Sequence, residues 1–221
     1  MRISILGDIH GKWRKANAVI NHEVKQEGYA LSTGDLCSYT FNPQRGQKLL
    51  FCHGNHDAFA YVAQLFGEPS NGLQALVPGK VYTVHALNIA VLPGVFSPHF
   101  YESSPTIKYY TRADLEKILA IKQKIDIFLS HEAPQGVGVI KQGKDMGKEH
   151  LNHIIQTLQP NLLFFGHHHG CYDSVIENTR VLGTDQVHHS YLLLNTEDLS
   201  IQRIKATLKE KEYFYPWEEK D

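Results

Sequence analysis

The sequence predicts an α/β protein with mixed sheets, and two features of its pattern carry that prediction. Apolar runs of four to six residues with little polar alternation recur along the chain, as in strands buried on both faces. Helix-like segments separate several of these runs, whereas residues 180–208 indicate consecutive strands joined by short turns. No repeat, low-complexity stretch or linker interrupts the pattern, so residues 1–221 are expected to form a single domain.

The predicted strands of the main body are Ile3–Leu6, Tyr29–Ser32, Leu49–Cys52, Val81–Val84, Ile89–Leu92, Ile125–Leu129 and Leu162–Phe165. The predicted helices, which place apolar residues near helical spacing, are Lys12–Gln26, Asp57–Phe66, Arg112–Lys124 and Lys148–Leu158. Asp57 is a favourable first residue for the second of these helices, and Gly67 is expected to end it. The tail is predicted to add strands at Val181–Leu182, Tyr191–Leu194 and Ile201–Ile204.

The 221 residues include 22 Lys and Arg against 23 Asp and Glu, a formal net charge of −1. A hydrophobic fraction of 42% and a charged fraction of 20% are ordinary for a globular domain and exclude disordered, collagen-like and coiled-coil proteins. The near-neutral charge creates no whole-molecule field toward nucleic acid or an anionic membrane, so a nucleic-acid partner would need a local basic patch. The unusual feature of the composition is its 14 histidines.

Cysteine usage and the lack of long apolar runs indicate a cytoplasmic location. Cys37, Cys52 and Cys171 form no CxxC and no even set, which favours free thiols in a reducing compartment. Cys37 and Cys52 adjoin polar clusters but are expected to be incidental thiols rather than ligands. The N-terminal apolar stretch is too short for a signal peptide, and no run reaches the roughly 18 residues of a membrane span, so no membrane partner is expected.

Polar clusters follow the apolar runs at the points where the predicted strands end. These clusters are Gly7-Asp8-Ile9-His10-Gly11, Gly34-Asp35, His53-Gly54-Asn55-His56-Asp57, Ser130-His131 and Gly166-His167-His168-His169-Gly170. In open α/β sheets, ligands bind beyond the carboxyl ends of the strands. Segments far apart in the sequence are therefore expected to bring polar side chains to one rim.

These side chains form a set of metal ligands without a thiolate. The set comprises Asp8, His10, Asp35, Asn55, His131, His167 and His169. Asp8 and His10 are two residues apart, as are His167 and His169, so in extended chain each pair would face one site. The set exceeds what one tetrahedral zinc needs and suits two ions, with a carboxylate such as Asp35 shared. Nitrogen and oxygen donors favour Mn, Fe or Zn, and such a positive pocket would attract an anion such as phosphate.

The order of these motifs resembles that of the calcineurin-like metallophosphoesterase superfamily. GDIHG, GD, GNHD, a lone His after an apolar run and GHHH occur in that order, over roughly residues 3–170. The resemblance implies a β-sandwich of two mixed sheets flanked by helices, a four-layer αββα arrangement, with a metal site at the carboxyl ends of strands. It also implies an enzyme that hydrolyses phosphoric esters with a dinuclear metal centre.

The resemblance assigns roles to individual residues by their motifs. One metal would be held by Asp8, His10 and His169, the other by Asn55, His131 and His167, with Asp35 bridging them. His56 would approach the leaving-group oxygen, and Asp57 would orient His56. The family often has a second acid three residues after the bridging Asp, where this chain has Ser38. That departure leaves the orientation of the neighbouring ligands open.

The reaction implied is hydrolysis of a phosphoester by a metal-bound hydroxide, without a covalent enzyme intermediate. Two divalent ions are the expected cofactors, Mn²⁺ or Fe²⁺ before Zn²⁺. The expected substrate is a phosphorylated small molecule or nucleotide, and an aromatic and basic loop at residues 94–112 tilts the expectation toward a phosphodiester. The alternative for this loop is a packed surface segment.

Candidate substrate-binding residues are His53, His99, Lys108, Arg112 and His168. His53 and His168 flank the motifs and also fit positions behind the metal ligands. Residues 132–147 are expected to form another wall of the pocket. The aromatic residues at 213–217 are expected to pack against the body as a terminal anchor.

Other functions fit parts of the pattern. A catalytically inactive scaffold of the same fold would dock partner proteins, and a metal sensor would bind ions without chemistry. The complete ligand set together with His56 favours the enzyme. The sequence leaves the physiological substrate, the native metal pair and the oligomeric state open.

Overall fold

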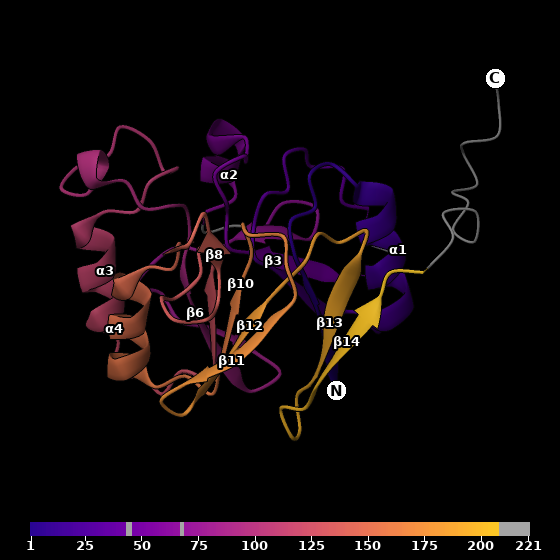
Figure 1. Ribbon diagram of the computed structural model, residues 1–221. Helices are drawn as coiled ribbons and strands as arrows, with labels where there is room; N and C mark the ends of the chain where they lie inside the picture. The colour runs from indigo at the N-terminus through magenta and orange to yellow at the C-terminus, as the bar shows by residue number, and fades with distance from the viewer. Residues whose placement is uncertain (43–45, 67–68, 208–221) are drawn as a thin grey trace.

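Two six-stranded sheets form the centre of the computed structural model, which describes residues 1–42, 46–66 and 69–207 (Figure 1). The strands of the first sheet are β1 (Arg2–Leu6), β2 (Tyr29–Ser32), β3 (Lys48–Phe51), β4 (Leu73–Ala75), β13 (Ser190–Asn195) and β14 (Ile201–Lys205). Those of the second sheet are β5 (Tyr82–Val84), β6 (Leu87–Leu92), β7 (Ile127–Ser130), β10 (Leu162–Phe165), β11 (Tyr172–Ile176) and β12 (Thr179–Gly183).

Both sheets are mixed, with a parallel core and antiparallel margins. In the first sheet the order is β14-β13-β1-β2-β3-β4, and β1 to β4 run parallel. In the second the order is β11-β12-β10-β7-β6-β5, and β6, β7, β10 and β12 run parallel. The remaining pairings are antiparallel. The carboxyl ends of each parallel core therefore lie on one side, which is the upper edge in Figure 1.

Helices cover the outer faces of the two sheets. The first sheet is covered by α1 (Trp13–Glu23) and α2 (Phe59–Gln64), and the second by α3 (Arg112–Leu119) and α4 (Glu149–Leu158). Apolar side chains fill three layers: beneath α1 and α2, between the sheets, and beneath α3 and α4. The predicted α/β fold of two mixed sheets flanked by helices is confirmed.

Unbroken apolar strands supply two of these layers at once. On β1, Ile5 packs between the sheets, whereas Leu6 packs beneath the helices of the first sheet. On β10, Phe164 lies between the sheets and Phe165 lies beneath the helices of the second sheet. Successive residues of a strand point to opposite faces, so a strand covered on both sides needs apolar residues at every position.

The structure corrects several predicted boundaries. The second helix begins at Phe59, not at Asp57. The Asp57 carboxylate does not cap this helix, because it accepts hydrogen bonds from backbone N–H groups outside the helix, such as that of Gly54. The third helix ends at Leu119, not at Lys124. The sequence did not predict β4, β11 or a hairpin of β8 (Ile140–Lys141) and β9 (Lys144–Asp145). These elements are short or carry polar residues, so they lack the continuous apolar run that marked the other strands.

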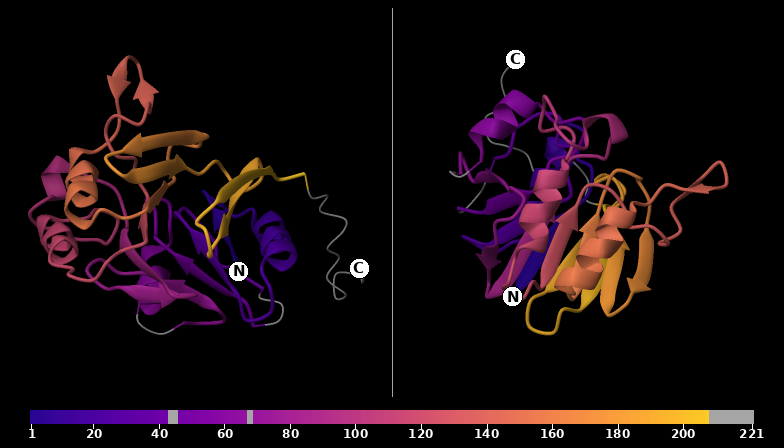
Figure 2. Two further views of the ribbon diagram at one scale, coloured as in Figure 1. Left: turned by 90° about the horizontal axis from the view of Figure 1, so that it is seen from below. Right: turned by 90° about the vertical axis from the view of Figure 1, so that its left-hand side faces the viewer.

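Both long loops are structured. Residues 94–112 contain the 3₁₀ helix η1 (Pro98–Phe100), and two backbone hydrogen bonds of Val95, with Lys108 and Tyr110, close the loop at its base. The β8–β9 hairpin lies within residues 132–147 and projects from the body in both views of Figure 2. Residues 213–217 lie outside the described part of the chain, and no helix in the described part is long and apolar enough to cross a membrane.

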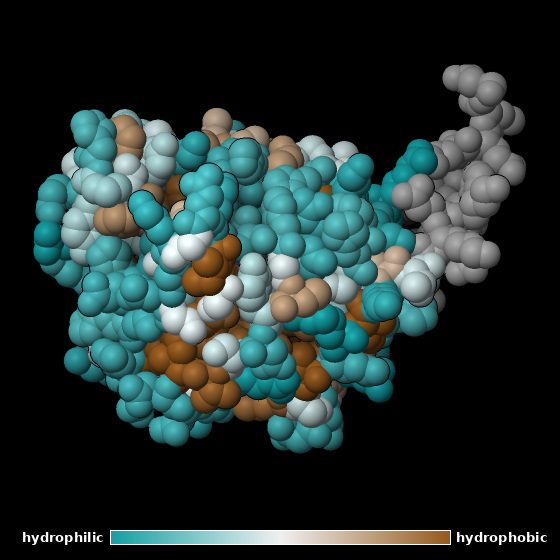
Figure 3. All heavy atoms as spheres, viewed as in Figure 1, coloured by the Kyte–Doolittle hydropathy of each residue, from teal (hydrophilic) through white to brown (hydrophobic). Residues whose placement is uncertain are grey.

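Polarity is unevenly distributed over the face seen in Figure 1. Hydrophilic residues cover most of its upper part, near the carboxyl ends of the parallel strands, while hydrophobic residues gather lower down, over β11 and β12 (Figure 3). Val175 on β11 is 65% exposed. The upper edge therefore differs in chemistry from the rest of this face, and it is where the predicted ligands are expected.

Candidate metal centre

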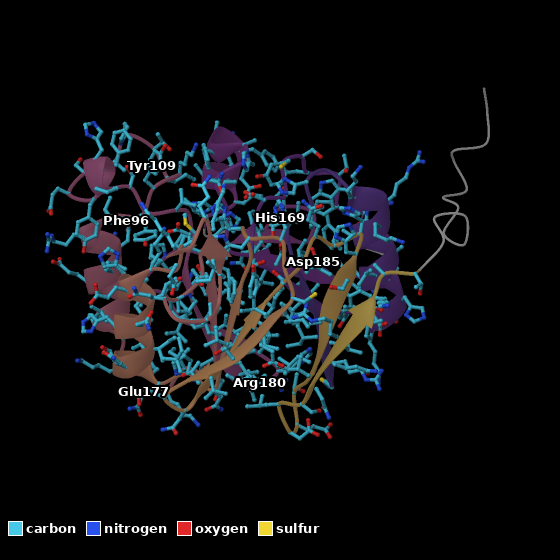
Figure 4. The ribbon with its side chains drawn as sticks, in the orientation of Figure 1. Phe96, Tyr109, His169, Glu177, Arg180 and Asp185 are labelled. Carbon is cyan, nitrogen blue, oxygen red and sulfur yellow. The ribbon has the colours of Figure 1, made fainter. Side chains whose placement is uncertain are left out.

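The predicted ligands meet at the edge where strands of both sheets end. Asp8 follows β1, Asp35 follows β2 and Asn55 follows β3, whereas His131 and His167 follow β7 and β10. Three strands of the first sheet and two of the second thus deliver polar side chains to the same place, with His169 on the upper side of the molecule (Figure 4). The sandwich positions the centre at the junction of its two layers.

One group of ligand atoms is formed by Asp8, His10 and His169, which all lie within 4.8 Å of one another. The Nε2 atoms of His10 and His169 are 3.1 Å apart, and His169 Nε2 is 3.5 Å from Asp8 Oδ1. Metal–nitrogen bonds of about 2.1 Å place neighbouring ligand atoms about 3.0–3.4 Å apart. The spacing of these atoms therefore fits three ligands of one ion.

A second group is formed by Asp35, His131 and His167, whose ligand atoms also lie within 4.8 Å of one another. Nε2 of His131 is 3.5 Å from Asp35 Oδ1 and 3.1 Å from the side-chain oxygen of Asn55. Nδ1 of the same ring donates to the carbonyl of Thr33 at 2.8 Å, so Nε2 is the nitrogen available to bind a metal ion. This group too presents ligand atoms toward a common centre.

Asp35 presents a different oxygen to each group. Its Oδ2 is 3.8 Å from His10 Nε2, while its Oδ1 is 3.5 Å from His131 Nε2. Oδ1 also accepts the backbone N–H of His56 at 2.8 Å. The carboxylate is 1% exposed, so its position is set by these neighbours. Its two oxygens therefore face the two groups.

The ligand-bearing turns are not extended, which corrects the pairing drawn from sequence spacing. His10, Asp35, His167 and His169 have φ values of 44°, 51°, 65° and 45°. His167 and His169 therefore do not face one site: His167 joins Asp35, and His169 joins Asp8. Non-glycine residues in this left-handed region are uncommon and cluster at functional sites.

Ligand side chains pack directly against Gly54, the glycine of the GNHD motif. A Cβ on Gly54 would lie 2.7 Å from Nε2 of His131 and would also collide with Oδ1 of Asp35. Any side chain at this position would push the two ligands apart. The glycine is needed here for space, because ligand atoms approach its backbone directly.

Asp57 holds the backbone beneath Asp35 rather than the ring of His56. Its carboxylate accepts backbone N–H groups of Asp35, Leu36, Cys37 and Gly54 at 2.7–3.1 Å, and the Tyr39 hydroxyl at 3.1 Å. It is 5% exposed. The prediction that this acid orients His56 is therefore replaced by a role in fixing the turn that carries Asp35.

His56 lies on the open side of the centre. The residue is exposed, and its ring centroid is 5.8 Å from that of His10. Its backbone N–H donates to Oδ1 of Asp35. A molecule entering above the two ligand groups would therefore meet this imidazole.

Residues behind the ligands contact the far nitrogens of the ligand rings and so orient them. The sequence did not identify these contacts. The thiol of Cys37 lies 3.3 Å from Nδ1 of His10, and the side-chain amide of Gln186 lies 3.0 Å from Nδ1 of His169. Ser38, which stands where the family often has an acid, instead receives the indole N–H of Trp13 at its carbonyl oxygen. The motif pattern could not indicate Gln186, because it comes from a distant segment after β12.

Burial and mutual interaction shift the titration of these groups in the absence of metal. Burial alone would raise the pKa of Asp35, but His131 and the His56 N–H hold it well below its usual range. Burial would lower the pKa of His131, yet the Asp35 carboxylate raises it to about 9. Burial lowers the pKa of His167 and that of His168 to about 4, and neighbouring positive charges act in the same direction.

The predicted substrate-binding residues are not brought together. His53 is 2% exposed and donates from Nε2 to the Ile107 carbonyl at 2.8 Å, so it is a buried residue and not a rim residue. His168 is half-buried, its ring centroid 4.8 Å from that of His167. His99 is exposed on η1.

The two cations among these candidates have other neighbours in the structure. Nζ of Lys108 lies 5.4 Å from the ring centroid of Tyr109. Arg112 forms an ion pair with Glu102 at 2.6 Å and covers the ring of Tyr101. Arg112 is thus engaged on the outer side of the loop, where it begins α3, and is not among the groups that converge on the ligands.

Comparison with known proteins adds independent findings. A family model described as calcineurin-like phosphoesterase matches residues 1–171. The lariat debranching enzyme of Schizosaccharomyces pombe is 24% identical over 177 residues, which are 66% of this chain and 38% of that enzyme. The chain thus matches well under two thirds of that relative's length.

Solved structures share the fold. TT1561 of Thermus thermophilus aligns with a TM-score of 0.66 at 14% identity, covering 93% of this chain and 98% of that one. A structure described as a novel archaeal phosphodiesterase aligns with a TM-score of 0.52 at 14% identity, covering 93% and 99%.

We expect the stability of the metal-free protein to be greatest near pH 6.5, the ordinary pKa of His. Below that pH the unfolded chain binds protons that His167 and His168, with native pKa values of about 4, do not take up, so stability falls. Above that pH, His131 keeps its proton up to about pH 9 in the native state, whereas the unfolded chain has already lost it. The contribution of this proton to the free energy of unfolding is therefore lost as the pH rises from 6.5 to about 9.

Urea-unfolding midpoints in EDTA, from about pH 4.5 to 9, measure this profile. The His131→Asn variant should lose the decline on the alkaline side. A midpoint that rises steadily from pH 6.5 to 9 in the parent protein would contradict the expectation.

Replacing Asp57 with Ala should lower the free energy of unfolding by about 3 kcal/mol or more, because four backbone N–H groups lose their acceptor. Tyr39→Phe is the matched control, since it removes a single donor and should cost about 1 kcal/mol. Equilibrium urea unfolding compares the two. Equal, small losses would show that Asp57 does not fix the turn.

Proposed function

This chain belongs to the calcineurin-like phosphoesterase family, and we propose that it is a metal-dependent phosphodiesterase. The observation that carries the proposal is the Asp35 carboxylate, which turns one oxygen toward His10 and the other toward His131. A carboxylate shared in this way suits two cations in adjacent sites. Enzymes with paired metals use such sites to hydrolyse phosphoesters.

The residues of the two groups would hold the ions. Asp8, His10 and His169 form one half of the site, Asn55, His131 and His167 form the other, and Asp35 contributes to both. Divalent ions bound there would acidify water and neutralise phosphoryl oxygens. The mixture of imidazole nitrogen and carboxylate or amide oxygen favours Mn²⁺ or Fe²⁺, with Zn²⁺ as a further candidate.

The protein's own groups would do the remaining work. Asp57 and the turn it supports hold Asp35 in place, and the contacts of His131, His10 and His169 fix the orientation of their rings. The exposed His56 is placed to donate a proton or hydrogen bond to the leaving-group oxygen of a phosphoester above the centre.

A diester is favoured over a monoester by the comparisons. The relatives include a lariat debranching enzyme, and an archaeal phosphodiesterase has the same fold. An inactive scaffold of this fold is disfavoured, because a docking protein needs neither converging ligand atoms nor an exposed imidazole beside them.

Asp35→Asn should lose both metal ions, because an amide offers only one oxygen and cannot serve both groups. Inductively coupled plasma mass spectrometry on protein that has been stripped with EDTA and reloaded with Mn²⁺ measures this. Asp8→Asn is the matched control, since Asp8 belongs to one group and should cost one ion. Retention of one ion in Asp35→Asn would show that Asp35 is not shared.

His56→Ala should reduce hydrolysis of bis-p-nitrophenyl phosphate by roughly 10²–10⁴-fold with the metal content unchanged. Parent activity should vanish with EDTA and return with Mn²⁺, and p-nitrophenyl phosphate should be the poorer substrate. His153→Ala, an exposed histidine on α4, should behave like the parent. Two bound ions without turnover of either ester would favour a sensor or scaffold.

A further inference from the structure

A cavity of about 620 Å³ lies beside the metal centre, and no part of the proposed reaction uses it. Its walls come from residues 104–107 and 109–111 of the long loop, from α3, and from the short segments that follow β3, α2, β4 and β6. Tyr109, in its wall, and His169, at the centre, are both on the upper side of the molecule (Figure 4). The volume is within the range of small-molecule sites, about 300–1,000 Å³.

A short segment of chain connects the cavity to the metal centre. His53 lines the cavity, and Asn55 of the second ligand group is two residues further on, which is about 7 Å of extended chain at most. The backbone oxygen of His53 accepts the N–H of Gly94, and its Nε2 donates to the carbonyl of Ile107. The loop that forms the cavity is therefore fastened to the segment that carries Asn55.

The lining is apolar and aromatic, with hydroxyl groups and no net charge. Phe66, Ile107 and Tyr109 supply apolar surface, and other wall residues supply hydroxyl groups. Among the described lining residues, the formal charges are those of Asp114 and Lys117, which pair with each other at 3.3 Å. The described walls therefore suit a neutral organic group.

An aromatic platform completes the chemistry. The ring of Tyr109 stacks on that of Phe100, with centroids 4.8 Å apart and planes at 28°. This pairing holds Tyr109 in the wall of the cavity. Flat heterocycles stack well on such rings, and every nucleobase has both a π-face and polar edge groups.

We propose that this cavity binds the nucleobase of a nucleotide diester whose phosphate lies at the metal centre. The inference rests on the proposed phosphodiesterase function and names its substrate class. The size of the cavity and its aromatic platform favour a base over an acyl chain.

Two esters with the same leaving group test the inference: p-nitrophenyl thymidine 5′-phosphate and methyl p-nitrophenyl phosphate. The parent should prefer the thymidine ester in kcat/KM, and Tyr109→Ala should reduce that preference about tenfold while the methyl ester is unaffected. Tyr101→Ala is the matched control, because it removes a ring from the same loop outside this cavity. Equal rates for the two esters in the parent would overturn the base site and leave the phosphodiesterase intact.

Binding of adenosine, followed by saturation-transfer NMR, tests the cavity without any hydrolysis. The parent and Tyr101→Ala should bind it, whereas Tyr109→Ala and the cavity-filling Val77→Phe should not. Binding without turnover of either ester would support the cavity and refute the phosphodiesterase. If the parent binds no adenosine, or if Val77→Phe binds it like the parent, the cavity is not a base site.

Discussion

The geometry of the centre depends on one carboxylate placed over another. Asp35 divides its two oxygens between the ligand groups, and Asp57 collects the N–H groups of the turn on which Asp35 stands. Both acids are almost fully buried, which is costly for a charge unless hydrogen bonds or cations compensate. Asp57 is compensated by N–H and O–H donors of the protein. Asp35 accepts one backbone N–H and lies beside the imidazoles of His10 and His131, and bound cations would complete its compensation.

The sandwich architecture explains why this demand can be met at a single place. A single parallel sheet brings ligands only to its own edge, whereas two sheets with aligned carboxyl ends surround a site from both layers. The two halves of the centre nevertheless do not correspond to the two sheets. His169, from the second sheet, joins Asp8 and His10 of the first, while Asp35, from the first, joins His131 and His167 of the second. Bound cations would therefore link the two layers at their polar edge, where the apolar interior ends.

The sequence predicted the fold because buried parallel strands need apolar residues at every position, and this makes runs such as Leu162–Phe165 conspicuous. It predicted which side chains converge because motifs at strand ends share one edge. Residue spacing could not predict the turn conformations: Asp8 and His10 do belong together, but the left-handed backbone at His167 and His169 sends these rings to different groups, a division that only the resemblance implied. Contacts from distant segments, such as Gln186 beside His169, and polar edge strands such as Tyr172–Ile176 leave no local pattern to read.

The loop at residues 94–112 is fastened by hydrogen bonds to the segment that carries Asn55 and His56. Its carbonyl at Ile107 fixes the ring of His53, and the N–H of Gly94 fixes the backbone of that histidine. The next residue, Gly54, donates to Asp57 and leaves no space for a side chain against Asp35 and His131. A displacement of the loop would therefore pass through His53 to the segment that carries Asn55 and His56. A group bound in the cavity would steady this segment from one side, as Asp57 does from the other, so the proposed base binding and the positioning of His56 would depend on the same short stretch of chain.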